Sequence, residues 1–449
     1  MRRFFPPISL PILAFLFVIL AGALLLQKDF CLRGAELSFI DALFTTTSAV
    51  CVTGLTVVDT GTSFSRTGQV VIMTLIQMGG LGIMTLTSLT FFLWRRRISL
   101  VDRLAVGNSL LHDRTFSLGG FLVRMVMWTL LAEGIGAIAL YLLAPTPLTP
   151  FAALFHAVSA FCNAGFSLYP DSLVRWVGAW HVNLVIMLLI VSGGIGFSVT
   201  EEIGRLLAGV RRRTTALSTL SWHSTIVLST TVLLIVAGAV ALYFSEFVGY
   251  DRQRPFAEAV LASLFQSVTC RTAGFNTLDV ASMTNLGLLV MIMLMYIGGG
   301  PGSTAGGIKV TTFRVVWCFI LAQLQGRQQA RSGRFAFSQE LIVQSLLLCI
   351  FSGMLIALAV LVLLVTEGGD TPHGRQGGLF MEVLFEAVSA FGTVGLSAGL
   401  TTKLSSAGKL VIVVLMFVGR LGPLVFLAAL KELHRVELYR YPEENVLIG

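Results

Sequence analysis

The feature that most constrains this chain is a motif that occurs four times. Each copy starts at a phenylalanine, has a serine or threonine four residues later, and reaches a glycine nine or ten residues after the phenylalanine. These glycines are Gly54, Gly165, Gly274 and Gly395, and a second glycine cluster follows each of them, starting at Gly79, Gly193, Gly298 and Gly419. Such self-similarity indicates that the chain is built from four related units.

Each unit contains apolar stretches long enough to cross a membrane. The chain has 449 residues, of which 55% are hydrophobic and 12% are charged, about half of the usual ~25% charged share. Runs of about 20 apolar residues match a hydrocarbon core of ~30 Å. These proportions predict an integral membrane protein and exclude a soluble enzyme and a disordered chain.

The order of elements within each unit follows from periodicity and punctuation. A long apolar helix is predicted at 8–26, 121–143, 225–244 and 341–365. A second long helix is predicted at 69–94, 182–203, 286–297 with a continuation, and 409–430. Between them lie a helix too short to span, such as 41–50 or 151–161, and a glycine-containing strip. We therefore expect an all-α integral membrane protein in which eight transmembrane helices and four re-entrant half-helices surround one central pore with pseudo-fourfold symmetry.

Charge distribution predicts the topology. The expected boundaries are residues 1–98, 99–210, 211–335 and 336–432 for the four units and 433–449 for a cytoplasmic tail. Arginine clusters at 95–97 and 211–213 follow the positive-inside rule, so the net charge of +8 is a topology signal with both termini cytoplasmic and indicates no nucleic-acid site. Arg2 and Arg3 before an apolar run resemble a secretory signal, but the run is long for one and opens the first unit, so we expect an uncleaved anchor.

Four irregular strips at membrane depth indicate a pore, because such backbone is tolerated only where it is buried in protein or lines a watery cavity. Carbonyl groups at the C-terminal ends of the half-helices favour a cation, and glycine allows close approach of carbonyl oxygens to it. The strips carry no ring of acids, which argues against divalent ions. The alternative is that these glycines only permit close helix packing, and their equivalent positions after four half-helices favour the filter.

The strips and the trailing glycines resemble the Trk/Ktr/HKT superfamily of potassium transporters, over residues 8–430. Because the first unit starts the sequence directly, without extra leading spans, the chain resembles the Ktr-type membrane subunits (KtrB) in particular. The resemblance places the potassium selectivity filter at Val52, Thr53, Gly54, Asn163, Ala164, Gly165, Thr272, Ala273, Gly274, Thr393, Val394 and Gly395. In the family a serine in the first strip accompanies sodium preference, so four glycines imply that potassium is the permeant ion. The resemblance also implies uptake across a bacterial inner membrane.

The second glycine cluster of the third unit predicts a break in its long helix, since each glycine costs ~1 kcal/mol relative to alanine and proline ~3 kcal/mol. The resemblance implies that this glycine-rich loop, residues 298–309, gates the pore. Its members are Gly298, Gly299, Gly300, Pro301, Gly302, Ser303, Thr304, Gly306, Gly307 and Lys309. A Walker A interpretation fails because the lysine does not directly follow the glycine and no strand precedes the loop.

Four basic residues, Arg124, Arg271, Lys309 and Arg420, are expected within the membrane zone. Arg420 replaces a glycine in the fourth trailing cluster, and we expect it to face the pore and hold the loop shut or repel cations, the alternative being a snorkelling structural arginine. Arg271 in the third strip is expected to point away from the axis and pair with a half-helix acid. The candidate acids are Glu258, Glu382 and Glu386. The partner of Glu133 stays open, since Arg124 lies two to three helical turns away and would reach it only through a neighbouring helix.

The resemblance further implies a homodimer, a cytoplasmic RCK ring of the KtrA type, and sodium as an activator. Potassium would be the permeant ion at the filter, with no cofactor in the chain and nucleotide only on the regulatory ring. Membrane lipids are the other expected partner, and nucleic acid is not. The alternative function is a secondary symporter that couples potassium to sodium or protons, which direct repeats and the lack of a midplane carboxylate pair disfavour. The sequence contains no hydrolase or metalloprotease motif, so it does not predict an enzyme. Its six cysteines form no CxxC pair, so it predicts neither a disulfide framework nor a zinc site.

Overall fold

The computed structural model describes residues 9–34, 36–82, 118–144, 148–211, 220–248, 253–369 and 377–422, together with Asp251 and Pro372. Within these residues every element is helical except a short hairpin, in which β1 (Arg331–Ser332) pairs antiparallel with β2 (Phe335–Ala336). The predicted clusters at 2–3 and 95–97, most of 211–213, the boundary at 98/99 and the tail 433–449 lie outside the described residues.

The described helices fall into four sets in chain order. The first set is α1 (Ser9–Leu26), α2 (Phe39–Val50), α3 (Thr60–Ser63) and α4 (Arg66–Gly80). The second is α7 (Leu118–Leu143), α8 (Pro150–Phe161), α9 (Trp180–Gly194) and α10 (Phe197–Arg211). The third is α11 (Trp222–Leu242), the π-helix η3 (Tyr243–Val248), α12 (Phe256–Thr269), α13 (Asn285–Tyr296) and α14 (Val310–Leu324). The fourth is α15 (Gln339–Gly368), α16 (Leu379–Gly392) and α17 (Ser406–Leu421).

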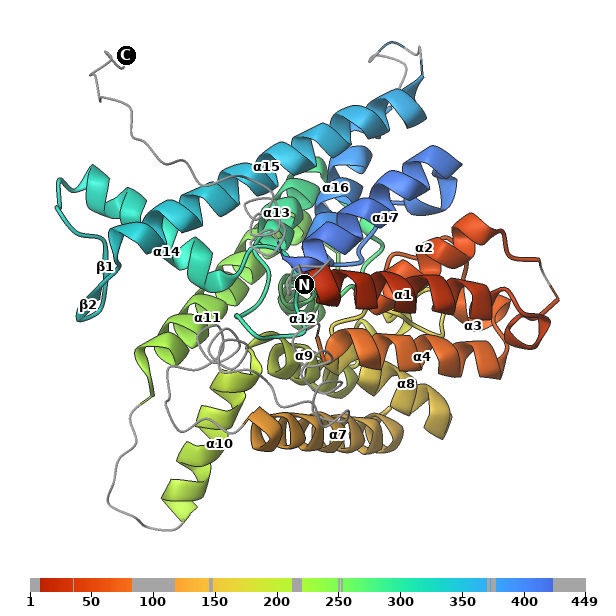
Figure 1. The fold of residues 1–449 in the computed structure, drawn as a ribbon, viewed down its shortest axis with the longest axis horizontal. Helices are drawn as coiled ribbons and strands as arrows, with labels where there is room; N and C mark the ends of the chain where they lie inside the picture. The colour runs from red at the N-terminus through yellow and green to blue at the C-terminus, as the bar shows by residue number, and fades with distance from the viewer. Residues whose placement is uncertain are drawn as a thin grey trace, which may run out of the picture.

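Contacts between the sets close a circle. Within the sets, the long first helix packs on the short helix in the pairs α1–α2, α7–α8, α11–α12 and α15–α16. Between the sets, α4 contacts α8, α9 contacts α12, α13 contacts α16, and α17 returns to contact α2. Figure 1 shows α1, α4 and α7 running in similar directions, with α15 and α17 inclined to them. The short helices α2, α8, α12 and α16, here called half-helices, therefore belong to one interior.

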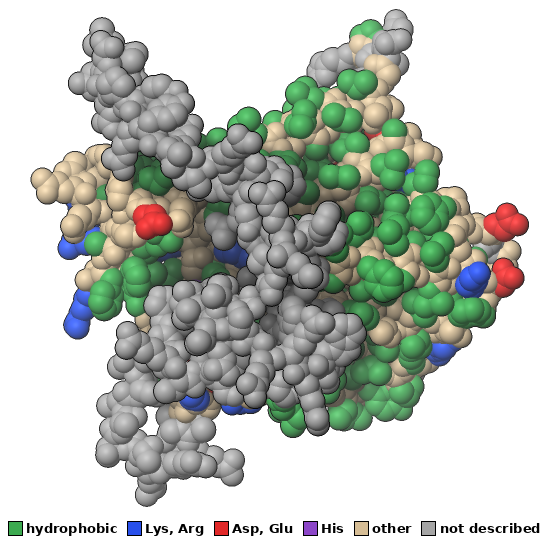
Figure 2. Space-filling model, in the orientation of Figure 1, with side chains coloured by type: hydrophobic (Ala, Val, Ile, Leu, Met, Phe, Trp, Pro, Cys, Tyr) green, Lys and Arg blue, Asp and Glu red, His purple; other side chains and the backbone are tan. Residues whose placement is uncertain are grey.

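Three described helices are long and apolar enough to cross a membrane, namely Leu122–Leu143, Trp222–Val248 and Gln339–Gly368. A fourth candidate is the pair α9 and α10, which is bent by 107°. The predicted continuous helix 182–203 is therefore wrong: Gly196 has a φ of 96°, a left-handed conformation that ends a right-handed helix. Hydrophobic side chains cover much of the surface over α1, α7, α15 and α17 in Figure 2, as contact with lipid requires.

Side-chain caps fix where the second long helices begin. The hydroxyl groups of Ser65, Thr284 and Ser405 each accept a hydrogen bond from the backbone N–H three residues later. Two of these caps are also held by a carboxylate from the end of the preceding long helix. Thr284 Oγ1 donates to Glu246 at 2.6 Å, and Ser405 Oγ donates to Glu367 at 2.6 Å. The two long helices of the third and fourth sets are thus tied together at one end.

In three of the four sets, a trailing glycine brings the second helix onto the end of its half-helix. A Cβ at Gly79 would collide with the carbonyl oxygen of Val50, and one at Gly193 would collide with that of Phe161. In the fourth set, a Cβ at Gly419 would collide with the carbonyl oxygen of Phe391. Close packing, which the sequence offered as the alternative role of the strip glycines, is therefore a role of these trailing glycines.

Replacing Gly193 by alanine tests this packing. Because the obstacle is a backbone carbonyl that cannot rotate away, we expect Gly193→Ala to lower the free energy of unfolding by about 1–3 kcal/mol, in the range of overpacked cores. The matched control is Gly353→Ala on α15, where nothing lies within 4 Å of the added Cβ and the change should be neutral or stabilising by up to about 1 kcal/mol. Thermal unfolding in detergent measures both, and equal melting temperatures for the two variants would contradict the packing role.

Candidate ion-conduction site

Four glycine strips, residues 52–54, 163–165, 272–274 and 393–395, follow the half-helices. Each final glycine is left-handed, with φ of 98° at Gly54, 68° at Gly165, 80° at Gly274 and 91° at Gly395. The residue two positions earlier is also left-handed in each strip: Val52 (56°), Asn163 (60°), Thr272 (68°) and Thr393 (50°). Valine and threonine rarely adopt this conformation. The surrounding structure therefore imposes it, as is common at functional sites.

Helix-capping bonds impose the left-handed turn. In the first strip, Thr53 N–H donates to Ser48 O at 2.8 Å and Val52 N–H donates to Ala49 O at 3.1 Å, the paired bonds of a Schellman motif. The second and fourth strips repeat this pattern through Ala164 to Ser159 and Val394 to Ser389. In the third unit the spacing from the phenylalanine to the strip glycine is one residue shorter, and Ala273 N–H donates instead to Thr269 O at 2.9 Å.

The four strips meet in cyclic order. A Cβ added to any strip glycine would collide with the carbonyl of the residue before the next glycine in the circle. The pairs are Gly54 with Ala164, Gly165 with Ala273, Gly274 with Val394, and Gly395 with Thr53. We call these four glycines and four carbonyls the carbonyl ring. The structure thus brings the strips chosen from the sequence together, and glycine is required there by the neighbour's approach as well as by its φ.

The four glycines of the carbonyl ring line a polar cavity of about 240 Å³. Asp59 and Asp279, each five residues after its strip glycine, line the same cavity. Beside it, a hydrogen bond from Arg175 lowers the pKa of the Asp171 carboxyl, and the charges of this ion pair cancel. The carboxylates of Asp59 and Asp279 are therefore the groups that favour the approach of cations to the cavity.

Four hydroxyl residues hold the strips, and the sequence analysis gave them no role. They are the serine or threonine of each motif copy: Ser48, Ser159, Thr269 and Ser389. Three of them donate to the carbonyl of the residue after the strip glycine, at Phe166 (2.8 Å), Phe275 (2.6 Å) and Leu396 (2.7 Å). Ser48 and Ser389 accept from the N–H of the strip glycine itself. Their fixed spacing after the phenylalanine was the signal that could have found them.

The glycine-rich loop, residues 298–309, connects α13 to α14 and packs against the strips. It is closed on itself by a bond from Gly298 N–H to Ile308 O at 2.7 Å. Gly300 N–H donates to Gly194 O at 2.8 Å, which anchors the loop to the second set. On the other side, Gly306 lies directly against the Thr393 side chain of the fourth strip. The loop therefore contacts a strip residue while spanning two sets of helices.

Two cations donate hydrogen bonds to carbonyls of this loop. Arg420 on α17 donates to the carbonyl of Thr304 in the loop and to that of Gly79 at the end of α4. Lys309 Nζ donates to Ala305 O at 2.5 Å. Neither cation forms an ion pair with a carboxylate of the described residues. Backbone carbonyls thus act as their partners, and Arg420 is anchored within the protein instead of snorkelling to the surface.

Comparison with known proteins identifies the family. Residues 14–435 match the model of the TrkH family, described as cation transport protein. The chain belongs to this family. It is 38% identical to Ktr system potassium uptake protein B of Bacillus subtilis, over 100% of this chain and 97% of that one, and 37% identical to potassium/sodium uptake protein NtpJ of Enterococcus hirae, over 100% and 98%. The resemblance read from the strips is confirmed, and this is a family of transporters, not of enzymes.

A solved structure supports the fold. The potassium transporter TrkH from Vibrio parahaemolyticus superposes with a TM-score of 0.72 at 19% identity, covering 96% of this chain and 86% of that one. The mainly helical architecture of the described residues is therefore that of the TrkH family.

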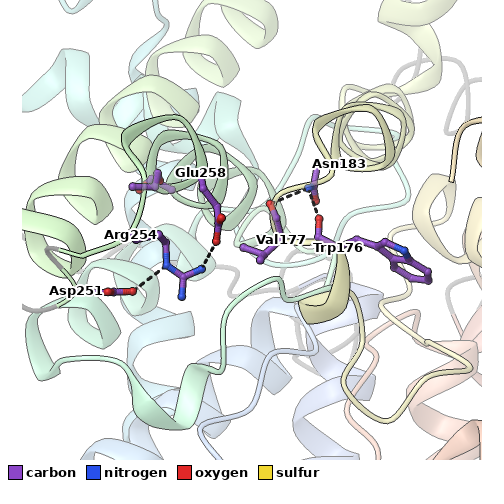
Figure 3. Close-up of polar contacts among 8 residues, drawn as sticks. Trp176, Val177, Asn183, Asp251, Arg254 and Glu258 are labelled. Atoms are coloured by element: carbon purple, nitrogen blue, oxygen red, sulfur yellow. Dashed lines mark hydrogen bonds and ion pairs between the residues drawn. The ribbon is translucent and has the colours of Figure 1, made fainter. Parts of the chain in front are cut away.

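The expected partner of Arg271 is wrong. Its guanidinium Nη2 donates to Gly298 O at 2.9 Å, at the start of the glycine-rich loop. Glu258 instead pairs with Arg254 at 2.8 Å, as Figure 3 shows beside the bonds from Asn183 to the Trp176 and Val177 carbonyls. Glu258 lies in the first turn of α12 and Arg271 just past its last residue, so about 20 Å of helix at 1.5 Å per residue separates them.

Two of the buried acids, Glu386 and Glu133, have neutral partners. Glu386 accepts hydrogen bonds from the hydroxyls of Ser397 and Thr401. Glu133 accepts from Gln77 Nε2 at 3.3 Å and lies 3.7 Å from Cys162 Sγ, while Arg124 pairs with Glu201 at 3.1 Å. The neighbours of Glu133 are thus Gln77 on α4 and Cys162 at the end of α8, and Arg124 is not its partner. No group of three metal-ligating side chains occurs among the described residues.

Removing a strip hydroxyl tests its role in this transporter. Ser389→Ala leaves the Gly395 N–H and the Leu396 carbonyl without a partner, and we expect the ratio of potassium to sodium flux to fall by a factor of about 3 to 10, since 1.4 kcal/mol corresponds to tenfold. The matched control is Ser263→Ala, whose hydroxyl donates only to Ala259 O of its own half-helix. Ion fluxes in proteoliposomes measure both, and an unchanged ratio in Ser389→Ala would rule out the clamp.

Proposed function

We propose that this protein is the pore-forming, ion-translocating subunit of a Ktr-type potassium uptake system. The observation that carries the proposal is the carbonyl ring, four backbone carbonyls and four glycines in cyclic contact, whose glycines line a polar cavity. Carbonyl oxygens in rings replace the hydration shell of a monovalent cation. Family membership and the potassium uptake named for the Bacillus subtilis relative support potassium as the permeant ion.

The proposed architecture has eight membrane crossings and four re-entrant half-helices around one pore with pseudo-fourfold symmetry. The four units are residues 1–98, 99–210, 211–335 and 336–432, with both termini in the cytoplasm of a bacterial inner membrane. The circular contacts between the four sets of helices support one shared axis. The twelve strip residues form the filter, and the chain itself needs no cofactor.

The glycine-rich loop is the proposed gate. Its contact with Thr393 of the fourth strip and its anchors at Gly194 and Arg420 support a position across the inner end of the pore. Arg420 would hold the loop closed through the Thr304 carbonyl, and Lys309 would hold its inner end. Because Arg420 and the Gly194 carbonyl hold the loop from outside it, release of either contact would favour opening.

Regulation is proposed to follow the relatives. The word "system" in the name of the Bacillus subtilis relative supports a second, regulatory component, for which we propose a cytoplasmic nucleotide-binding RCK ring docked on a homodimer. The name of the Enterococcus hirae relative mentions sodium, which supports activation by that ion. The exposed basic segment around β1 and β2, with Arg327, Arg331 and Arg334, offers a docking surface.

Substitution of the first strip glycine tests the filter. We expect the wild-type chain to restore growth of a potassium-uptake-deficient bacterium at low potassium, and Gly54→Ser to lose most of this rescue because an added side chain meets the Ala164 carbonyl. The matched control is Gly34→Ser, which has a left-handed φ of 83° but nothing within 4 Å of its Cβ. Failure of the wild-type chain to rescue, with or without a regulatory ring, would contradict potassium uptake.

Shortening the loop tests the gate. Deletion of Gly300, Pro301 and Gly302 removes the anchor to Gly194, and we expect potassium flux in proteoliposomes to rise severalfold, while Arg205→Gln on the exposed face of α10 leaves it unchanged. Unchanged flux after the deletion would reject the gate. The measurement also separates the symporter alternative, because a pore conducts when every sodium and proton gradient is removed and a symporter does not.

A further inference from the structure

Arg271 belongs to two parts of the site at once. Its backbone directly precedes the third strip, and its side chain, only 7% exposed, donates to the first carbonyl of the glycine-rich loop at Gly298. Both ends of this link are fixed. Arg271 N–H donates to Val268 O on the half-helix α12, and Gly298 N–H donates to Ile308 O within the loop.

The other three units lack such a link. The residue three positions before the strip glycine is Cys51, Cys162 and Gly392 in the first, second and fourth units, and Arg271 in the third. None of these three side chains can extend beyond the end of its half-helix as an arginine does. The third unit is also the one whose second helix is interrupted by the glycine-rich loop between α13 and α14. The long side chain therefore occurs where there is a loop for it to hold.

The guanidinium of Arg271 has a second nitrogen, Nη1, that is available to donate to the loop. Among the described residues its Nη1 has no hydrogen-bond partner, and neither does the hydroxyl of Thr231. Both residues line a small cavity of about 10 Å³ together with Gly299 of the loop. A buried donor without a partner is unusual, and here it leaves the guanidinium free to follow the loop when the loop moves.

The positive charge of Arg271 determines which way a cation in the carbonyl ring would push its side chain. Arg271 forms no ion pair with a described carboxylate, so its positive charge is balanced only by carbonyl dipoles. A cation in the carbonyl ring repels this guanidinium, and the repulsion is stronger in a low-dielectric interior than in water. An occupied ring thus favours a guanidinium displaced toward the loop, which is the differential interaction that a shift between two states requires.

We propose that Arg271 couples the filter to the gate, so that cation occupancy of the carbonyl ring sets the position of the glycine-rich loop. The coupling rests on the proposed function, and Arg271 acts in it as a positioning residue. Since coupling between two sites is reciprocal, a change in the loop must also alter ion binding in the ring.

The test measures the loop while ions fill the filter. The full chain, with its six cysteines replaced by alanine and Ser303→Cys added in the loop, is reconstituted in liposomes. The rate at which a charged thiol reagent modifies Cys at this position is compared at low and at saturating potassium. We expect the two rates to differ by about fivefold or more, the lower end of typical allosteric coupling, and the ratio to fall to about one in Arg271→Gln.

A matched control is Arg254→Gln on the same unit, whose guanidinium pairs with Asp251 and Glu258 at the far end of α12. It should keep the wild-type ratio. A merely structural role for Arg271 would lower the yield of folded protein or the total flux and leave the ratio unchanged. A wild-type ratio in Arg271→Gln, or a ratio of one in the unsubstituted background, would overturn the coupling.

Two further measurements separate the ways in which the idea can fail. If Arg271→Gln does not fold, Arg271→Met replaces it, because methionine keeps a long side chain but has neither the charge nor a hydrogen-bond donor, and a full wild-type ratio in that variant would equally overturn the coupling. Potassium flux is recorded in the same liposomes. No flux through the wild-type chain refutes the proposed function, whereas normal flux with an unchanged ratio in the Arg271 variant refutes the coupling alone.

Discussion

The contact between each strip glycine and the carbonyl of the next strip is the constraint on which the rest of the structure depends. A side chain at Gly54, Gly165, Gly274 or Gly395 would separate neighbouring strips, so the four carbonyls meet only if all four positions are glycine. The half-helices deliver the strips to this point, and the trailing glycines allow the second long helices to approach closely enough to support the half-helix ends. The packing of the half-helices and of the second long helices thus supports one small ring of backbone atoms.

This arrangement costs conformational energy. Val52, Thr272 and Thr393 are β-branched residues in the left-handed region, where an L-residue loses roughly 1–2 kcal/mol. Capping bonds from the strips to the half-helix carbonyls offset this cost, and the motif hydroxyls add bonds on the far side of the glycine. Each strip is thereby held at both ends. In the proposed filter, a strip fixed in this way would keep its carbonyls in place when a cation leaves, which a flexible strip would not do.

The sequence predicted the parts of the site that have a residue-type signal. Repeated glycines, short helices and the glycine-rich loop follow from composition and spacing, and the family followed from them. The left-handed turns at Val52 and Thr393 could not be predicted, because these residue types disfavour them and only the capping bonds impose them. The bend at Gly196 was missed since a single glycine is usually tolerated in an apolar helix. The partner of Arg271 was expected to be an acid because opposite charges attract. Arg271 instead lies just past the end of α12, where its side chain reaches the Gly298 carbonyl.

The third set of helices differs from the others in the glycine-rich loop between α13 and α14. In the proposed pore, four equivalent strips would suit conduction but offer no single element to move, and this loop would supply one. Three cations, Arg271, Lys309 and Arg420, donate to carbonyls of this loop, and none forms an ion pair among the described residues. In the proposed pore, positive charge held beside the cation path opposes conduction. Opening in this proposal therefore requires that the loop carbonyls are released from these cations when the loop moves.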